Sequence, residues 1–213
     1  MQAHRNISRN PNHPKKGTST KVEPIRNLSD IQKLKILLAD NPRDICLFTL
    51  GINTAFRSCE LLSITVEQVA HLKAGDRLDL KQSKNSKYRS VTLNNNAVNA
   101  IQTCLAVHPS PTPDAPLFFS KTTGQALRSN TVSKYMKGWC KQAGLQGNYA
   151  SHTMRKTWGY QVYRNYPVLM DNTRPTKIAE LMIAYGHATE RQTLEYLCIQ
   201  DKDISALYMG MEL

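Results

Sequence analysis

His152 and Arg155 stand three positions apart, and on a helix this spacing places both side chains on one face. A neutral imidazole there could accept a proton from a nucleophile while the guanidinium holds the phosphate under attack. The pattern is short, however, and a surface pair without chemistry is its common alternative.

Two further cations lie upstream. Arg57 is in the most apolar part of the chain, where a permanent charge needs a partner, either Glu60 at i+3 or an incoming anion. Lys84 lies in the polar turn 82–87. A loop lysine can protonate the leaving oxygen of a phosphodiester, although a solvated turn is the usual meaning of such a sequence.

The remaining candidate groups lie near the C-terminus. Gly186 ends one predicted helix, and Thr189 with Gln192 has the capping-box spacing that begins the next. His187 is therefore expected in a tight turn, and Tyr196 about two turns along the following helix. A phenol becomes a nucleophile when its proton is removed. A lone tyrosine on an amphipathic helix more often packs in a core or an interface.

The elements that must position these groups are mainly helical. An apolar helix begins near Leu28, where Ser29 and Gln32 have capping-box spacing. Asn41-Pro42 opens a second helix that is apolar enough to be central to the core. A turn around Asn53-Thr54 then leads into a short third helix.

Alternating patterns predict two strands, 77–80 and 88–93, which form a hairpin around the cationic turn. Leu117-Phe118-Phe119 is a candidate for a further short strand. Later helices are expected at about 95–106, 130–143, 151–165, 176–185 and 190–198. The predicted fold class is therefore mainly α with a small antiparallel β-hairpin (α+β).

The composition is basic. The chain has 213 residues, with 28 Lys and Arg against 16 Asp and Glu, a formal net charge of +12 and 40% hydrophobic residues. The hydrophobic fraction suits an ordinary folded domain, and the positive surplus favours a polyanionic partner such as nucleic acid. Ribosomal and membrane-surface proteins can be equally basic, so charge says nothing about chemistry.

The five cysteines are odd in number and widely spaced, and they include no C-x-x-C pair. This argues against a disulfide framework or a zinc knuckle and suits buried thiols in a reducing compartment. No apolar run approaches the roughly 20 residues of a membrane span, and the N-terminus lacks a signal-peptide core. We therefore expect a cytoplasmic protein without membrane contact.

Residues 1–22 are polar, with no acidic residue before Glu23, which predicts a flexible basic tail. Residues 23–213 are expected to form one domain. Its last segment, 201–213, has apolar residues at amphipathic spacing and should dock either in cis or on another subunit.

The order and combination of these motifs are more specific than any one motif. Together they resemble the tyrosine recombinase, or phage integrase, family through the series Arg57, Lys84, His152, Arg155, His187 and Tyr196. The first arginine also opens a segment similar to the R-x-x-E-L-L box of that family, and the lysine falls in its usual β-hairpin. The resemblance covers roughly residues 28–200.

The resemblance implies the tyrosine recombinase catalytic-domain fold and an enzyme that cleaves and rejoins DNA. Arg57 and Arg155 would hold the non-bridging oxygens of the scissile phosphate. His152 would assist proton removal from Tyr196, and His187 would donate a hydrogen bond to the phosphate. The product would be a 3′-phosphotyrosine link, which the 5′-hydroxyl of another strand reverses without a metal or nucleotide cofactor.

In this scheme Lys84 would protonate the departing 5′ oxygen. The implied partner is double-stranded DNA at the nucleoid, bound by a homo-oligomer, a tetramer. The acidic pairs Asp76 with Asp79 and Asp201 with Asp203 match no two-metal nuclease pattern, which disfavours a metal-dependent nuclease.

The sequence departs from the family pattern in several places. Only some 27 residues precede the first predicted helix, so the N-terminal DNA-clamping, or core-binding, domain is expected to be absent, in a natural catalytic-domain-only member or in a fragment. Asn53-Thr54 replaces the usual glycine before the first arginine box, and Tyr185 replaces a common leucine. The spacing between the second arginine and the next histidine is long, with Tyr166-Pro167 and Arg174-Pro175 marking an inserted loop.

Two alternatives stay open at this point. A type IB topoisomerase uses similar Arg, Lys and Tyr chemistry to relax supercoils, but this short chain has little with which to enclose a duplex. A DNA-binding protein without catalysis would result if the missing clamp or a misplaced Tyr196 left the site idle.

Overall fold

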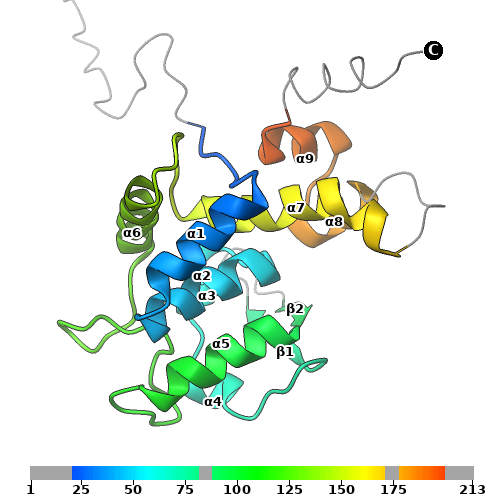
Figure 1. Cartoon of the computed structure of the whole chain (residues 1–213). Coiled ribbons are helices and arrows are strands. Elements are labelled where there is room, and N and C mark those ends of the chain that lie inside the picture. The colour runs from blue at the N-terminus through cyan, green and yellow to red at the C-terminus, as the bar shows by residue number, and fades with distance from the viewer. Residues whose placement is uncertain (1–20, 82–87, 171–177, 200–213) are drawn as a thin grey trace, which may run out of the picture.

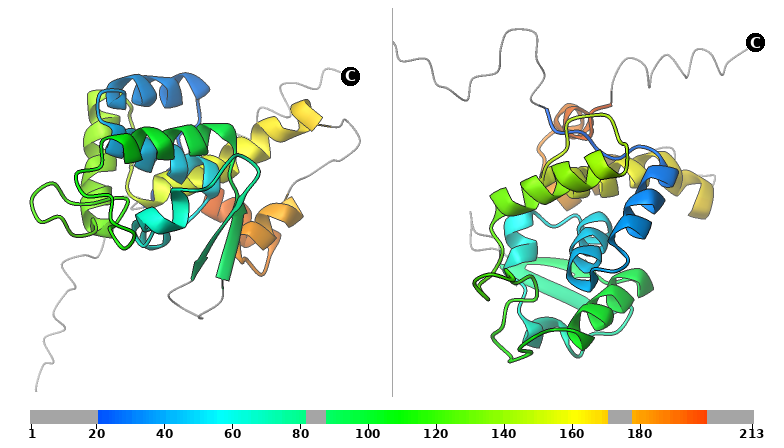
Figure 2. Two further views of the ribbon diagram at one scale, coloured as in Figure 1. Left: turned by 90° about the horizontal axis from the view of Figure 1, so that it is seen from below. Right: turned by 60° about the vertical axis from the view of Figure 1, so that its left-hand side comes forward.

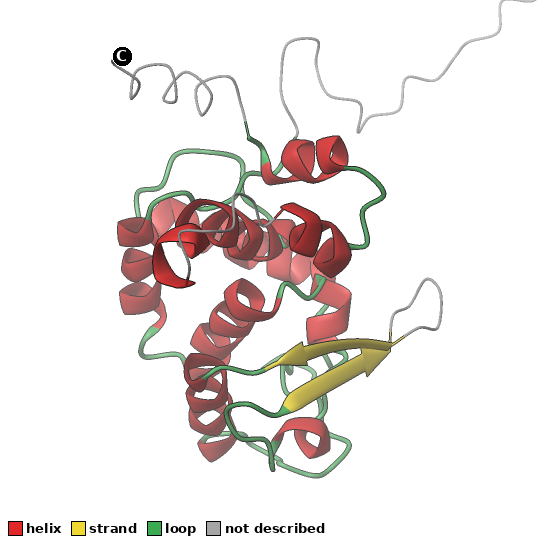
Figure 3. Cartoon of the chain, turned by 90° about the vertical axis from the view of Figure 1, so that its right-hand side faces the viewer, coloured by secondary structure: helices red, strands yellow, loops and turns green. Residues whose placement is uncertain are grey.

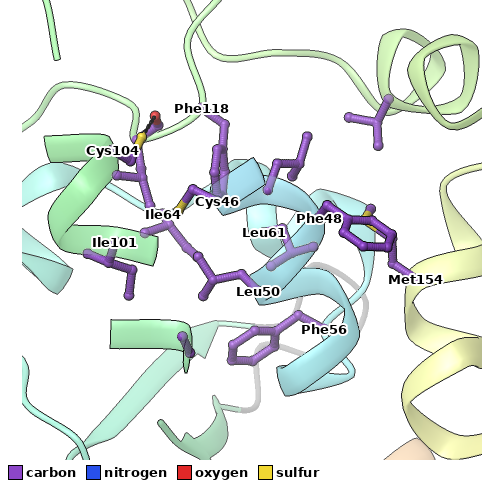
Figure 4. Packing of buried hydrophobic residues seen from close by; sticks show 14 of the residues in the cluster. Cys46, Phe48, Leu50, Phe56, Leu61, Ile64, Ile101, Cys104, Phe118 and Met154 are labelled. Carbon is purple, nitrogen blue, oxygen red and sulfur yellow. Dashed lines mark hydrogen bonds between the residues drawn. The ribbon is translucent and has the colours of Figure 1, made fainter. Parts of the chain in front are cut away.

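The fold is built around α2 (Pro42–Thr54) in the computed structural model, which describes residues 21–81, 88–170 and 178–199 (Figure 1). Most of this helix is buried, and it packs mainly against α5 (Asn95–Ala106) and α7 (His152–Met170). Figure 4 shows Phe48 of α2 directed toward Met154 of α7. The predicted central position of this helix is confirmed.

The two ends of α2 bear out one prediction and shift another by one residue. Pro42 takes the first helical position and Asp44 lies in the first turn, as expected. Asn53 and Thr54 are the last residues of the helix, and both side chains donate hydrogen bonds to carbonyls one turn earlier. The turn predicted around them therefore begins one residue later. The turn is made by Ala55, whose backbone is left-handed with φ of 53°.

α1 (Leu28–Leu38) packs on α2 and begins where predicted, but with a different cap. The N-cap is Asn27, which is extended, and its carbonyl accepts a hydrogen bond from the N–H of Ile31 at 3.3 Å. Ser29 already lies inside the helix, so the predicted capping box of Ser29 and Gln32 is wrong. A capping side chain must precede the first helical residue, and here the helix begins one residue before Ser29.

β1 (Arg77–Lys81) and β2 (Tyr88–Thr92) form the predicted antiparallel hairpin (Figure 3). The register pairs Leu78 with Val91 and Leu80 with Arg89. Because both leucines are buried, this face of the hairpin is turned toward the core.

The predicted strand at Leu117-Phe118-Phe119 is wrong. Within this stretch Phe119 forms an isolated bridge with Ala126, and the preceding Pro116 forms another with Thr65. The first two residues of the stretch are fully buried, so the apolar run serves the core without joining a sheet. Periodicity alone cannot tell a short buried strand from other buried segments.

Further helices complete the described part of the chain. They are α3 (Ser58–Leu62), α4 (Val66–Val69), α6 (Ser129–Gln142), α8 (Ile178–Tyr185) and α9 (Glu190–Leu197). α7, α8 and α9 pack on one another beside the apolar centre, as Figures 1 and 2 show. The predicted fold class, mainly α with a small antiparallel sheet, is confirmed.

α7 is longer than predicted. It runs from His152 to Met170, so Tyr166-Pro167 lies within a helix and does not mark a loop. Proline has φ fixed near the helical value, and it removes one backbone donor. Arg174-Pro175, the other mark of the expected insertion, lies outside the described residues.

The segment before α1 is held on α7. The N–H of Ile25 donates to Thr157 Oγ1 at 2.9 Å, and Lys156 Nζ donates to the carbonyl of Val22 at 2.7 Å. The end of the expected basic tail therefore contacts the folded body. Residues 1–20 and the expected amphipathic segment 201–213 lie outside the described residues.

Candidate active site

The N-terminal turn of α7 supplies two of the predicted groups. His152 is the first residue of the helix and is exposed, whereas Arg155, one turn later, is only 4% exposed. The Arg155 guanidinium donates hydrogen bonds to the carbonyl of Ala55 and, at 3.3 Å, to that of Tyr185. Because Ala55 is the left-handed turn after α2, the end of that helix fixes the direction of this cation.

Arg57 is the N-cap of α3, and its partner is Glu60. Arg57 Nη1 lies 2.7 Å from Oε1 of the carboxylate, and Oε2 accepts a hydrogen bond from the N–H of Arg57 at 2.7 Å. Of the two predicted partners, the internal ion pair is therefore present. The Arg57 side chain is still 35% exposed, so the same cation remains accessible to an anion.

A cleft of about 640 Å³ opens beside Arg57. Its walls come from β2, from Trp158 of α7 and from residues 183–186 at the end of α8. Segments far apart in the sequence thus line one space next to the partly exposed guanidinium of Arg57.

His187 lies in the turn between α8 and α9, as predicted. Gly186 ends α8 with φ of 71°, a conformation that favours glycine. His187 Nδ1 is 3.0 Å from the hydroxyl of Thr193, and its ring stacks on Tyr185 with centroids 5.2 Å apart. Thr193 is fully buried in α9, so the helix that follows the turn also orients the imidazole.

Tyr196 lies in the last turn of α9, which is capped by the side chain of Thr189 as predicted. The Tyr196 hydroxyl is 3.5 Å from His152 Nδ1. Its ring lies at centroid distances of 5.0 Å from Tyr185 and 5.2 Å from His187. The fold therefore brings a phenol and an imidazole together across 44 positions of sequence.

The protonation of Tyr196 is balanced between burial and charge. Burial raises the pKa of the phenol, and the positive charges of Arg155, Arg57 and Arg89 oppose that rise. An anionic phenolate would thus form among three guanidinium groups.

Both imidazoles have lowered pKa values. Partial burial, followed by the charges of Arg155, Lys156 and Arg57, lowers the pKa of His152. Burial and the charges of the same two arginines lower the pKa of His187. The rings are therefore neutral at neutral pH, and His152 is in the form that accepts a proton.

Tyr185 is a central residue of this site, and its sequence position showed only a departure from a common leucine. Its hydroxyl donates a hydrogen bond to the carbonyl of Arg155 at 2.8 Å, and its ring centroid is 4.7 Å from the Arg155 guanidinium carbon. Gly159 makes room for this contact, because a Cβ there would overlap the Tyr185 hydroxyl. No sequence signal reveals such a close approach of two helices.

Two more cations were missed by the motif reasoning. Lys156 is buried, with Nζ 4.8 Å from the centroid of the Tyr196 ring and 3.5 Å from Cys198 Sγ. Arg89 lies on the inward face of β2, near Glu60. The strand pattern carried a usable signal for this arginine, since alternate residues of a strand share one face.

Lys84, the predicted general acid, lies outside the described residues, between the ends of β1 and β2. Among the residues that are described, no group of three or more His, Cys, Asp or Glu side chains is placed to hold a metal ion. No helix in the described ranges is long and apolar enough to cross a membrane.

Known proteins are similar to this chain in sequence and in fold. A family model described as "Phage integrase family" matches residues 26–201. "Probable integrase/recombinase YoeC" of Bacillus subtilis (strain 168) is 29% identical over 188 residues, which are 88% of this chain and 95% of YoeC. "Tyrosine recombinase XerC" of Caldanaerobacter subterraneus subsp. tengcongensis is 26% identical over 204 residues, which are 93% of this chain but 54% of XerC.

Solved structures agree on the fold. The XerA recombinase matches with a TM-score of 0.68 at 19% identity, over 88% of this chain and 65% of XerA. The XerH recombinase bound to a palindromic difH substrate gives 0.64 at 17%, over 89% of this chain and 53% of XerH. A lambda integrase dimer bound to a COC′ core site gives 0.59 at 17%, over 84% of this chain and 49% of that chain.

The chain therefore belongs to the phage integrase family. The predicted class, an enzyme of the tyrosine recombinase type that recombines DNA, is confirmed at the level of the family, and the topoisomerase and idle DNA-binding alternatives gain no support. The chain spans nearly all of YoeC and about half of XerC.

Proposed function

We propose that this chain cleaves and rejoins double-stranded DNA at a specific site through a covalent 3′-phosphotyrosine intermediate, with Tyr196 as the nucleophile. The observation that carries the proposal is the 3.5 Å distance between the Tyr196 hydroxyl and His152 Nδ1, beside the buried Arg155. A hydroxyl next to a neutral imidazole and fixed cations suits attack on a phosphodiester.

In the proposed step, the Tyr196 oxygen forms a bond to phosphorus while the bond from phosphorus to the 5′ oxygen breaks. The phenolic proton passes to His152, and the 5′ oxygen takes a proton that we assign to Lys84. The strand is left with a 3′-phosphotyrosine and a free 5′-hydroxyl. Attack by the 5′-hydroxyl of another strand reverses both transfers, so the scheme needs no nucleotide cofactor.

The remaining groups stabilise charge in this proposal. Negative charge grows on the non-bridging oxygens in the five-coordinate transition state, where donors fixed in advance are most effective. Arg155 is held by two carbonyls and Arg57 by Glu60, so neither cation has to reorganise. His187, oriented by Thr193, would donate a hydrogen bond to the phosphate from its other ring nitrogen.

The assembly on DNA is part of the same proposal. Exchange between two duplexes requires four strand cleavages, and each copy of the chain supplies one Tyr196. We therefore propose a homo-tetramer on DNA. The XerH and lambda integrase neighbours are bound to DNA, and the latter is a dimer. We place the activity at the nucleoid, in the cytoplasm, because DNA is the substrate.

The experiment must find the target as well as the chemistry. We would incubate the full chain with nicked suicide duplexes of randomised sequence, in which the short 5′-hydroxyl fragment diffuses away and the covalent adduct accumulates. Protein-linked DNA is then recovered under denaturing conditions and sequenced. The expected result is an adduct with one family of duplexes.

Tyr196→Phe should abolish that adduct. Tyr149→Phe is the matched control, because the Tyr149 hydroxyl bonds only the carbonyl of Gln146, away from the site, and this variant should retain it. An adduct that persists in Tyr196→Phe would contradict the nucleophile, and no adduct with any duplex would contradict the function. A plasmid that carries the recovered site should give recombinant products, whereas relaxation of any plasmid without them would favour a topoisomerase.

A further inference from the structure

Arg89 occupies a position where the hairpin pattern favours an apolar side chain. It pairs with Leu80 across the hairpin, on the inward face that also carries Leu78 and Val91. Its neighbour Tyr88 is 70% exposed on the other face, whereas the Arg89 side chain is only 11% exposed. A buried guanidinium is costly unless a partner balances its charge.

The nearby carboxylate is already engaged. Arg89 Nη1 is 3.7 Å from Glu60 Oε2, while Arg57 binds each of the two carboxylate oxygens at 2.7 Å. The guanidinium carbon of Arg89 also lies 5.6 Å from the centroid of the Phe56 ring. Glu60 therefore pairs with both arginines, and its contact with Arg89 is the longer of the two.

The charges of the candidate active site do not cancel in the described part of the chain. Arg57, Arg89 and Arg155 are three guanidinium groups, and Glu60 is the carboxylate paired with two of them, which leaves a formal surplus of two positive charges. Arg155 hydrogen-bonds two carbonyl groups and Tyr196, and none of these partners in the described part of the chain is a carboxylate. A phosphodiester is singly charged, and further negative charge develops on its oxygens during attack. Arg57 and Arg155 with Glu60 would match the ground state, and adding Arg89 matches the transition state.

We infer that Arg89 is a third phosphate-binding arginine of this site, which contacts a non-bridging oxygen of the scissile phosphate and stabilises the charge that grows there. Arg89 lines the same cleft as Arg57, and its charge reaches Tyr196. This inference rests on the proposed DNA cleavage by Tyr196.

The test compares a charged with a neutral phosphate. Arg89→Met keeps the length of the side chain and removes its charge. On a duplex recovered as above, we expect this variant to form the covalent adduct about 10²-fold more slowly than the wild type. On the same duplex with a methylphosphonate at the scissile position, which lacks the negative charge, the ratio of wild-type to variant rates should fall to within a few-fold.

Arg77→Met is the matched control, because Arg77 is an exposed arginine of the same hairpin, bonded to Ser90 Oγ. Any decrease in the rate of adduct formation in this variant should be equal on the phosphodiester and the methylphosphonate duplexes. If the wild type cleaves the methylphosphonate too slowly to measure, duplexes with sulfur in place of either non-bridging oxygen serve instead. Arg89→Met should then weaken the discrimination between the two sulfur isomers.

Equal losses for Arg89→Met on charged and neutral duplexes, or no loss on the phosphodiester, would overturn the inference and leave Arg89 a structural residue. Arg89→Lys keeps the charge and covers the case in which Arg89→Met does not fold. It should form the adduct faster than Arg89→Met. If Arg89→Met is unfolded, Arg89→Lys should fold and should be slower than the wild type on the phosphodiester, and the ratio of the two rates should fall toward one on the methylphosphonate. Failure of the wild type to form an adduct with any duplex is a different result, since it removes the proposed function itself.

Discussion

Two buried arginines of this molecule, Arg43 and Arg155, have opposite surroundings. Arg43, in the first turn of α2, lies 2.6 Å from Asp44 Oδ1 and donates to the carbonyl of Phe119 at 2.7 Å. Asn41 binds the other carboxylate oxygen of Asp44 at 3.0 Å. Arg155 is equally buried, but its partners among the described residues are two carbonyl oxygens and Tyr196, with no carboxylate.

Under the proposed function, the difference separates a cation that stabilises the fold from a cation that binds the phosphate of the substrate. Asp44 neutralises the charge of Arg43 within the fold, so this arginine offers no unbalanced charge to an anion. Around Arg155 the positive charges of Arg57 and Arg89 add to it, and only Glu60 opposes them in the described chain. A fold tolerates such a surplus where a bound anion removes it.

The largest expected effect is on stability, at Arg43. Arg43→Met leaves the buried Asp44 without its cation, and we expect a loss of about 3–5 kcal/mol in the free energy of unfolding, measured with urea. Cleavage by the folded fraction should be unchanged. The double variant Arg43→Met with Asp44→Leu should recover part of the loss, and a single variant as stable as the wild type would refute the comparison.

Arg155→Met should act mainly on rate. We expect covalent adduct formation to slow by about 10²–10³-fold, because one fixed donor to the phosphate is removed. Stability should change less than in Arg43→Met, since no carboxylate is left unpaired and repulsion with Arg57 and Arg89 is relieved. A loss of stability as large as that of Arg43→Met would show that both arginines mainly stabilise the fold.

The dependence of the cleavage rate on pH should show the protonation of His152 on the acid side. In the proposed mechanism neutral His152 accepts the proton of Tyr196. Because the pKa of this imidazole is lowered, the neutral form persists until the pH falls below the usual value of 6.5. The cleavage rate should therefore be level near neutral pH and fall on acidification with a midpoint below that value. His152→Gln should be about 10²-fold slower and lose this midpoint. His71→Gln, at an exposed histidine, should keep the wild-type profile.

The smallest expected effects come from two helical glycines. Gly159→Ala should destabilise the fold by about 1–3 kcal/mol, because the added Cβ displaces the Tyr185 ring that underlies Arg155. Gly138→Ala on α6 meets nothing within 4 Å and should stabilise it by about 0.5–1 kcal/mol. Thermal unfolding of the two variants measures both shifts, and equal shifts would contradict the tight packing at Tyr185.

Much of the fold followed from local patterns. Pro42 marked the start of α2, Thr189 the cap of α9, and Gly186 the turn between α8 and α9, because each acts through its own backbone or its immediate neighbours. The error at Ser29 and the one-residue shift at Asn53-Thr54 arose where the choice of helix end depends on one residue of register. The strand predicted at 117–119 failed because burial, which a short apolar run does indicate, does not specify hydrogen-bond partners.

The sequence by itself determined which chemistry is open to this chain, because a phenol, two imidazoles and permanent cations are properties of residue types and of their order. Only the tertiary structure decided how those groups are held. Tyr196 meets His152 across 44 positions, Tyr185 fits against Gly159, and Arg89 shares Glu60 with Arg57. Each of these contacts joins different elements, so it depends on packing that no local pattern encodes.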